Sequence, residues 1–106
     1  MWPWESAVSG QTVCGWSPGN SELHINGDIP MAFRLQYHLT RDNTWLRQHA
    51  WPVLRATAAF WASRVSVANS TTGNYTVRQV VGPDESSGIV DDEAYVQRKA
   101  MLVPYA

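Results

Sequence analysis

Three short polar clusters interrupt an otherwise apolar sequence, and they hold the residues that could carry chemistry. They are PWES at residues 3–6, ELHINGD at 22–28, and GPDE at 82–85, the last followed by VDD at 90–92. In GPDE, Pro83 restricts the backbone directly before two carboxyl groups, so Glu85 could be aimed at one atom. Cleavage of a glycosidic bond needs such an acid to protonate the leaving oxygen, and a second carboxylate opposite it. On residues alone, the simpler interpretation is a solvated acidic turn.

The other clusters allow two further chemistries, and neither is favoured. His24 with Glu22 and Asp28 could suggest a metal site, but only one His lies in the cluster, which favours a hydrogen-bonding role. Cys14 with His24 could suggest a thiol nucleophile, but nothing supplies a third, orienting group. The sequence therefore predicts no metal and no cofactor.

Composition narrows the possible partners. The chain has 106 residues, a formal net charge of -1 and 16% charged residues, so nothing recruits nucleic acid or an anionic membrane. No apolar run reaches the roughly 18 residues of a membrane span, and residues 1–20 lack the basic start and apolar stretch of a signal peptide. Six Trp are unusual in so short a chain. Their flat faces could stack on sugar rings, although the core is the first expectation for any single Trp.

The elements that must position these clusters are expected to be mainly helices. Residues 1–28 are predicted to be a loop that lines a site, because Gly and Pro recur there without a hydrophobic period. Residues 29–65 are predicted to hold helices at 29–40, 44–49 and 53–65, with N-caps at Asp28 and at Asp42 or Asn43, and Pro52 at the third helix start.

The second half of the chain is predicted to hold a hairpin, a loop and one helix. Within residues 66–91, Tyr75–Val81 is expected to pair with the end of the preceding segment at Val65–Val67, followed by the loop of GPDE. Residues 92–103 are predicted to form the final helix, with Asp91 and Asp92 as its N-cap and first-turn charge.

The helix at 53–65 indicates the architecture. It is apolar nearly all round, so it should be buried on most sides, which a two-layer helical barrel would achieve with this helix in its inner ring. The expected class is all-α, and the 106 residues are expected to be part of a larger, barrel-shaped helical domain.

Taken together, the motifs resemble glycoside hydrolase family 65. PWESA, HINGD, FWASRV and PDE occur in the family's order, and the resemblance covers about residues 1–95. It implies an (α/α)6 barrel that cleaves a terminal α-linked glucose with inversion. It implies Glu85 as the catalytic general acid and Trp61 as a sugar contact. It also places Trp4, Glu5, His24 and Asp28 near the sugar.

The resemblance leaves several substrates and roles open. The opening stretch is most similar to members that release glucose from the hydroxylysine-linked disaccharide of collagen-type glycans. Cleavage of trehalose, phosphorolysis of a disaccharide, sugar binding without catalysis, and an inert truncated piece are alternatives. Asn69-Ser70-Thr71 and Asn74-Tyr75-Thr76 fit the N-glycosylation pattern, which tilts the location towards a secretory or lysosomal route without excluding the cytoplasm.

Overall fold

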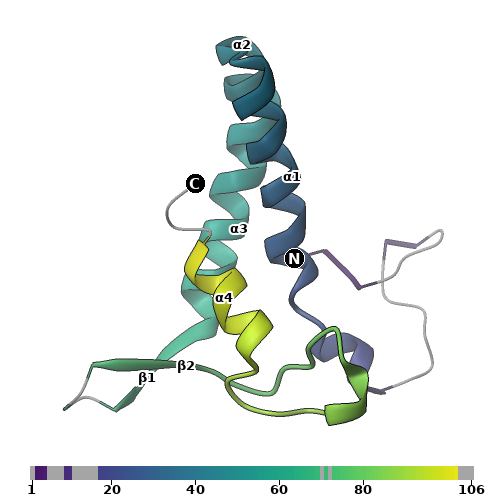
Figure 1. Ribbon diagram of the computed structural model, residues 1–106, viewed down its shortest axis with the longest axis vertical. Helices are drawn as coiled ribbons and strands as arrows, with labels where there is room; N and C mark the ends of the chain where they lie inside the picture. Colours follow the sequence, from purple (N-terminus) through teal and green to yellow (C-terminus); the bar gives the residue numbers. More distant parts are fainter. Residues whose placement is uncertain (1, 5–8, 11–16, 70, 72, 103–106) are drawn as a thin grey trace.

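The structure is a computed structural model, and it describes residues 2–4, 9–10, 17–69, 71 and 73–102. Helices dominate this part of the chain (Figure 1). In chain order the elements are a 3₁₀-helix Ser17–Ser21, α1 Ile25–Thr40, α2 Asn43–Trp45, a π-helical turn Leu46–Ala50, α3 Trp51–Arg64, β1 Val65–Asn69, β2 Asn74–Val77, a 3₁₀-helix Glu85–Ser87 and α4 Ala94–Leu102. α1 and α3 run side by side in opposite directions, and the hairpin, the loop after β2 and α4 lie at their foot (Figure 1). The predominantly helical class is therefore confirmed.

α1 begins at Ile25, four residues before the predicted start, so the prediction that Asp28 is its N-cap is wrong. The reason lies at Pro30, which sequence reasoning placed in the first turn. Pro30 has no amide hydrogen, so the carbonyl of Asn26, four residues earlier, loses its usual helical donor. The indole Nε1 of Trp61 donates to that carbonyl instead, over 3.3 Å. A contact from α3 thus allows the helix to extend through Pro30.

The predicted second and third helices form one continuous run. Asp42 caps its start as predicted, because Oδ1 accepts hydrogen bonds from the amides of Thr44 and Trp45 over 2.8 and 2.9 Å. The predicted break before Pro52 is absent. The π-helical turn leads directly into α3, and this wider turn precedes a proline whose ring would clash with the carbonyl four residues back in a regular helix.

α3 buries one stripe of its surface within the described residues. Leu54, Thr57 and Trp61 are buried, at the three- and four-residue spacing of a single helical face. Trp51 is 54% exposed, and Ala59 and Ala62 are exposed as well. The remaining apolar faces of this helix are therefore not covered by the described chain.

The predicted hairpin is confirmed, with a shorter second strand. β1 and β2 pair antiparallel, with Val65 opposite Val77. Beyond Val77 the chain leaves the strand at Gln79, whose φ of 54° lies in the left-handed region. The oxygen Oδ1 of Asp91 accepts a hydrogen bond from the Gln79 amide over 2.9 Å. Val80 then pairs with Val90 as an isolated antiparallel bridge, so the loop of GPDE is closed at its base.

The prediction that Asp91 and Asp92 cap the last helix is wrong. Asp92 Oδ1 accepts hydrogen bonds from the Val77 amide and the Thr76 hydroxyl, over 2.9 and 2.8 Å. These bonds hold the pKa of Asp92 below its usual range. α4 begins at Ala94, and Oε2 of Glu93 accepts from the Val96 amide over 2.8 Å. The cap is therefore Glu93, and Asp92 ties the end of the loop to β2.

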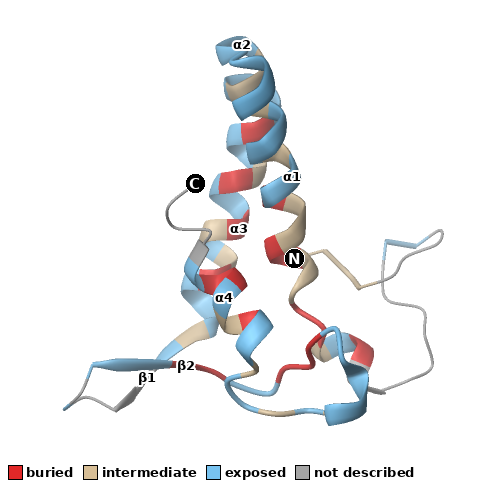
Figure 2. Ribbon diagram, in the orientation of Figure 1, coloured by how far each residue is buried: buried red, intermediate tan, exposed pale blue. Residues whose placement is uncertain are grey.

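One small core joins these elements. It consists of Leu23, Trp61, Val77, Val80, Val96 and Ala100. Figure 2 shows that the buried residues gather where the start of α1, α3, α4 and the segment after β2 meet. No helix in the described ranges is both long and apolar enough to cross a membrane.

Candidate active site

The segment that leads into GPDE is anchored by backbone pairing and burial. Val80 exchanges two hydrogen bonds of 2.9 Å with Val90, and the Val81 amide donates to the carbonyl of Ser21 over 3.0 Å. Val80 and Val81 are fully buried. Gly82 packs closely on Glu93, because a Cβ atom added at Gly82 would lie 2.5 Å from Cδ of Glu93. The residues before Pro83 are therefore held in place from both sides.

The two carboxyl groups of GPDE have different environments. Oδ1 of Asp84 accepts from the Ser86 amide over 3.1 Å and also from the Ser86 hydroxyl. These two hydrogen bonds hold the pKa of Asp84 below its usual range. Glu85 is the first residue of the 3₁₀-helix, its side chain is exposed, and its carbonyl accepts from the Gly88 amide over 3.1 Å. Asp84 thus caps the turn, and Glu85 lies exposed on it.

The cluster ELHINGD lies beside this turn and contains buried polar atoms without partners. Glu22 is 2% exposed, and within the described chain its Oε1 has no hydrogen-bond partner. Burial raises the pKa of Glu22, and the negative charge of Glu85 raises it further. His24 Nδ1 is also buried without a partner in the described ranges. The imidazole packs edge-on against the ring of Tyr95, with centroids 5.8 Å apart.

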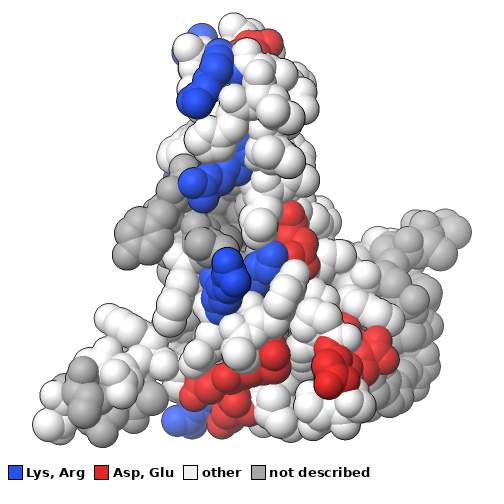
Figure 3. Space-filling model, viewed as in Figure 1, with Lys and Arg blue, Asp and Glu red and all other residues white. Residues whose placement is uncertain are grey.

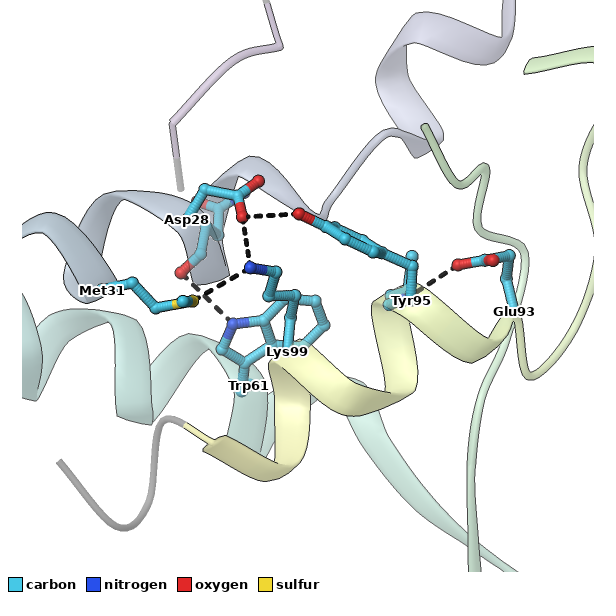
Figure 4. A network of polar contacts seen from close by, with 8 residues as sticks. Asp28, Met31, Trp61, Glu93, Tyr95 and Lys99 are labelled. Carbon is cyan, nitrogen blue, oxygen red and sulfur yellow. Dashed lines mark hydrogen bonds and ion pairs between the residues drawn. The ribbon is translucent and has the colours of Figure 1, made fainter. Parts of the chain in front are cut away.

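Asp28 lies at the centre of a polar network between α1 and α4 (Figure 4). Its Oδ1 accepts from Lys99 Nζ at 2.5 Å and from the Tyr95 hydroxyl at 3.0 Å. Lys99 is 7% exposed, and its Nζ also lies 3.0 Å from Met31 Sδ and 4.7 Å from the centre of the Tyr95 ring. Burial lowers the pKa of Lys99, but the bonds to Asp28 and Tyr95 outweigh it and leave the pKa above its usual range.

Gly27 makes this network possible. A Cβ atom at Gly27 would lie 2.5 Å from Lys99 Cβ, so only glycine allows α1 and α4 to approach this closely. The glycine of the HINGD motif therefore has a packing role.

The two predicted Trp contacts lie in different settings. Trp61 is 1% exposed and belongs to the core, where its Nε1 bonds to Asn26. Trp4 is half-buried near the start of the chain. Glu5 and Cys14 lie outside the described residues.

The structure brings two of the predicted residues together at one side chain. His24 and Asp28 both contact Tyr95. Sequence reasoning had considered Glu22 only as a metal ligand and had assigned no role to Tyr95 or Lys99. Their spacing of four residues on one helix, as an aromatic and a cation, was the available signal.

Acidic side chains gather at the foot of the molecule, over the loop between β2 and α4 (Figure 3). This loop contains Asp84, Glu85, Asp91, Asp92 and Glu93. In the described ranges, no three His, Cys, Asp or Glu side chains converge as a metal site would require.

A carboxyl group exposed on an anchored turn is the kind of group that a glycosidase uses as its acid. Residues 1–103 match the glycosyl hydrolase family 65 central catalytic domain, and the chain belongs to this family. The resemblance drawn from the motifs is thereby confirmed.

Named relatives cover almost all of this chain. It is 41% identical over 103 residues to the kojibiose hydrolase of Flavobacterium johnsoniae, covering 95% of this chain and 15% of that protein. It is 40% identical over 100 residues to the protein-glucosylgalactosylhydroxylysine glucosidase of Gallus gallus, covering 92% and 14%. It is 33% identical over 104 residues to the cell wall acid trehalase of Candida albicans, covering 97% and 10%. The chain therefore spans only 10–15% of the length of these three relatives.

Proposed function

We propose that this chain carries the general-acid segment of an α-glucoside hydrolase, with Glu85 as the proton donor. The observation that supports it is the contrast between the two carboxyl groups of GPDE. Asp84 is fixed as an ionised cap by Ser86, whereas Glu85 is exposed on a turn whose base is buried and paired. Neighbouring carboxyl groups with different environments are the usual sign of separate acid and structural roles.

The proposed reaction is inverting hydrolysis of a terminal α-linked glucose. Glu85 donates its proton to the departing glycosidic oxygen as the bond to the anomeric carbon breaks. Water attacks the opposite face of the sugar and gives its proton to a second carboxylate, which an inverting enzyme holds about 6.5–9.5 Å from the acid. We propose that this base lies in the part of family 65 proteins that the chain does not span, and that the helices here form part of an (α/α)6 barrel.

The proposed substrate is a carbohydrate with a terminal α-glucose, of the glucosylgalactosyl-hydroxylysine type. The name of the Gallus gallus relative supports this choice, and the kojibiose hydrolase and acid trehalase relatives favour other α-glucosyl disaccharides as alternatives. The assay therefore compares all three substrate types.

Within ELHINGD, we propose His24 and Asp28 as sugar contacts. His24 has a buried ring nitrogen without a partner in the described chain. Both bonds to Asp28 use Oδ1, which leaves Oδ2 to accept from a sugar hydroxyl. Trp4 and Glu5 remain predicted contacts from the PWES motif. For Trp61, sugar stacking also stays a prediction, and its burial gives it a structural role in addition.

The test is Glu85→Gln in the natural protein that carries this chain, with Asp84→Asn as the matched control. General-acid catalysis contributes about 10²–10⁴-fold, so Glu85→Gln should slow hydrolysis of a natural α-glucosyl disaccharide by that factor. Asn can still accept from the Ser86 amide, so Asp84→Asn should keep the turn and cost much less. A larger loss for Asp84→Asn than for Glu85→Gln would contradict the assignment.

A further inference from the structure

Asn26 of the HINGD motif is a fully buried polar residue for which the proposed reaction gives no role. Its Oδ1 accepts a hydrogen bond from the Trp2 amide over 2.7 Å, and its Nδ2 donates to the Trp2 carbonyl over 3.3 Å. Nδ2 also donates to the carbonyl of Leu23 over 3.1 Å. Both ends of the side-chain amide are therefore engaged, the oxygen as acceptor and the nitrogen as donor.

The pairing of Asn26 with Trp2 has the form of main-chain pairing in a sheet. The Asn26 side chain bonds both the N–H and the C=O of one residue, as an opposite residue in an antiparallel strand would. A buried main-chain group without a partner is costly, so this reciprocal pair fixes where Trp2 lies against α1. The two residues are 24 positions apart, and the contact joins the residue before PWES to the HINGD motif.

The sequence after Trp2 carries this orientation on to Trp4. Residue 3 is proline, whose ring fixes its own φ at about −65° and restricts the residue before it to extended backbone. Few free torsions therefore separate the clamped main chain of Trp2 from the side chain of Trp4. Trp4 is half-buried and is one of the two predicted sugar contacts in PWES.

Asn26 is itself held firmly enough to act as an anchor. Its amide donates to the Leu23 carbonyl over 3.0 Å, and its carbonyl accepts from Nε1 of Trp61 over 3.3 Å. Trp61 is 1% exposed and belongs to the core. Asn26 therefore connects the residue before PWES and the helix of FWASRV, the first through its side chain and the second through its main chain. A change of its side chain leaves the acceptor of the Trp61 bond in place.

We propose that Asn26 is a positioning residue, which holds the PWES segment so that Trp4 faces the sugar. The inference rests on the predicted sugar contact of Trp4 within the proposed function, and it adds the residue that orients this contact. The role requires no contact between Asn26 and the sugar, because both polar atoms of its side chain are already bonded within the protein.

The test variant is Asn26→Ala in the natural protein that carries this chain, with Thr57→Ala as its matched control. A cavity of about 200 Å³ is lined by Asn26, Thr57 and Trp2, among other residues, so water can reach the polar groups that Asn26→Ala leaves. Thr57 is 1% exposed, but its hydroxyl donates to carbonyls of its own helix. Thr57→Ala therefore removes a buried polar group beside the same cavity and leaves the bonds to Trp2 in place.

The first measurement is a double-mutant cycle on kcat/KM for a natural α-glucosyl disaccharide. Misplacement of a binding group by about 1 Å costs up to about 10²-fold, so Asn26→Ala should lower kcat/KM by about 10–100-fold. In a Trp4→Ala background no indole is left to position, and the same change should cost no more than about twofold. Thr57→Ala should lower the thermal midpoint of unfolding and leave kcat/KM within about twofold. An equal loss for Asn26→Ala in both backgrounds would mean that Asn26 only supports the fold, and it would overturn the proposal.

The second measurement does not depend on the folding of Asn26→Ala. Hydrogen exchange resolved to single amides should show that the Trp2 amide of the unmodified protein is protected. Rapid exchange there would overturn the proposal, because the 2.7 Å hydrogen bond would not hold the segment. In Asn26→Ala the Trp2 amide should exchange faster while the amides of α3 keep their rates. An unchanged rate at Trp2 in this variant would equally overturn the proposal.

The result for Trp4→Ala alone separates this inference from the general-acid assignment. If Trp4→Ala leaves kcat/KM unchanged, Trp4 is no sugar contact and the positioning role falls with it. Glu85 keeps its role in that case if Glu85→Gln slows the disaccharide far more than α-glucosyl fluoride, whose leaving group needs little protonation. If Glu85→Gln slows both substrates equally, the general-acid assignment fails whatever the cycle shows.

Discussion

The substitution Gly82→Ala tests how the loop of the proposed acid is fastened to α4. The added Cβ would lie 2.5 Å from Cδ, 2.8 Å from Oε2 and 2.9 Å from Oε1 of Glu93. Ordinary contacts of this kind are about 3.5–4.0 Å, so the carboxyl group must move by roughly 1 Å. That movement breaks the 2.8 Å hydrogen bond from the Val96 amide. Loss of a helix cap costs about 0.5–2 kcal/mol, and this is the destabilisation we expect.

A double-mutant cycle separates this mechanism from a general intolerance of alanine at position 82. Glu93→Ala removes the same cap and should cost about 1 kcal/mol. In the Glu93→Ala background the clash is gone, so Gly82→Ala should add almost nothing, and the coupling should be about 1 kcal/mol. Urea unfolding of the four proteins measures these differences. Costs that add within roughly 0.5 kcal/mol would refute the reasoning.

Three further predictions follow from the contacts between α1, α4 and β2. Gly27→Ala should lower the thermal midpoint of unfolding more than Gly82→Ala. The new Cβ at position 27 would lie 2.5 Å from Lys99 Cβ, which is fixed to the backbone, whereas at position 82 it meets the flexible end of Glu93. Equal midpoints for the two variants would contradict this. Asp28→Asn should destabilise more than Lys99→Met in the same melts, since it leaves a buried ammonium unpaired, and the reverse order would show that the pair is not the cause. The pKa of Asp92 is lowered by its bonds to β2, so its stabilisation is present at neutral pH and lost as pH falls below about 4; Asp92→Asn should flatten that acid dependence of the melting midpoint.

Local signals in the sequence were sufficient for much of the fold. The cap at Asp42 and the strand pairing at Val65 were predicted correctly, because both depend on residues close in the chain. Glu85 was assigned as the general acid from the family motifs, and that role stays a prediction, while the capping of the turn by Asp84 is what the structure adds.

Two of the errors share one physical cause, which is a partner far along the chain. The start of α1 was missed because the donor that replaces the amide of Pro30 comes from Trp61 on another helix. Asp92 was assigned to the nearest helix start, but its donors lie on β2. No local pattern reveals such contacts.

The most direct test of the central claim measures rate against leaving-group acidity. A series of aryl α-glucosides and α-glucosyl fluoride should be hydrolysed by the natural protein that carries this chain and by its Glu85→Gln variant. If Glu85 supplies the proton, the unmodified protein should depend weakly on leaving-group acidity and the variant steeply, with fluoride cleaved at nearly the same rate by both. Parallel dependences, with every substrate slowed by the same factor, would contradict the assignment of Glu85 as the general acid.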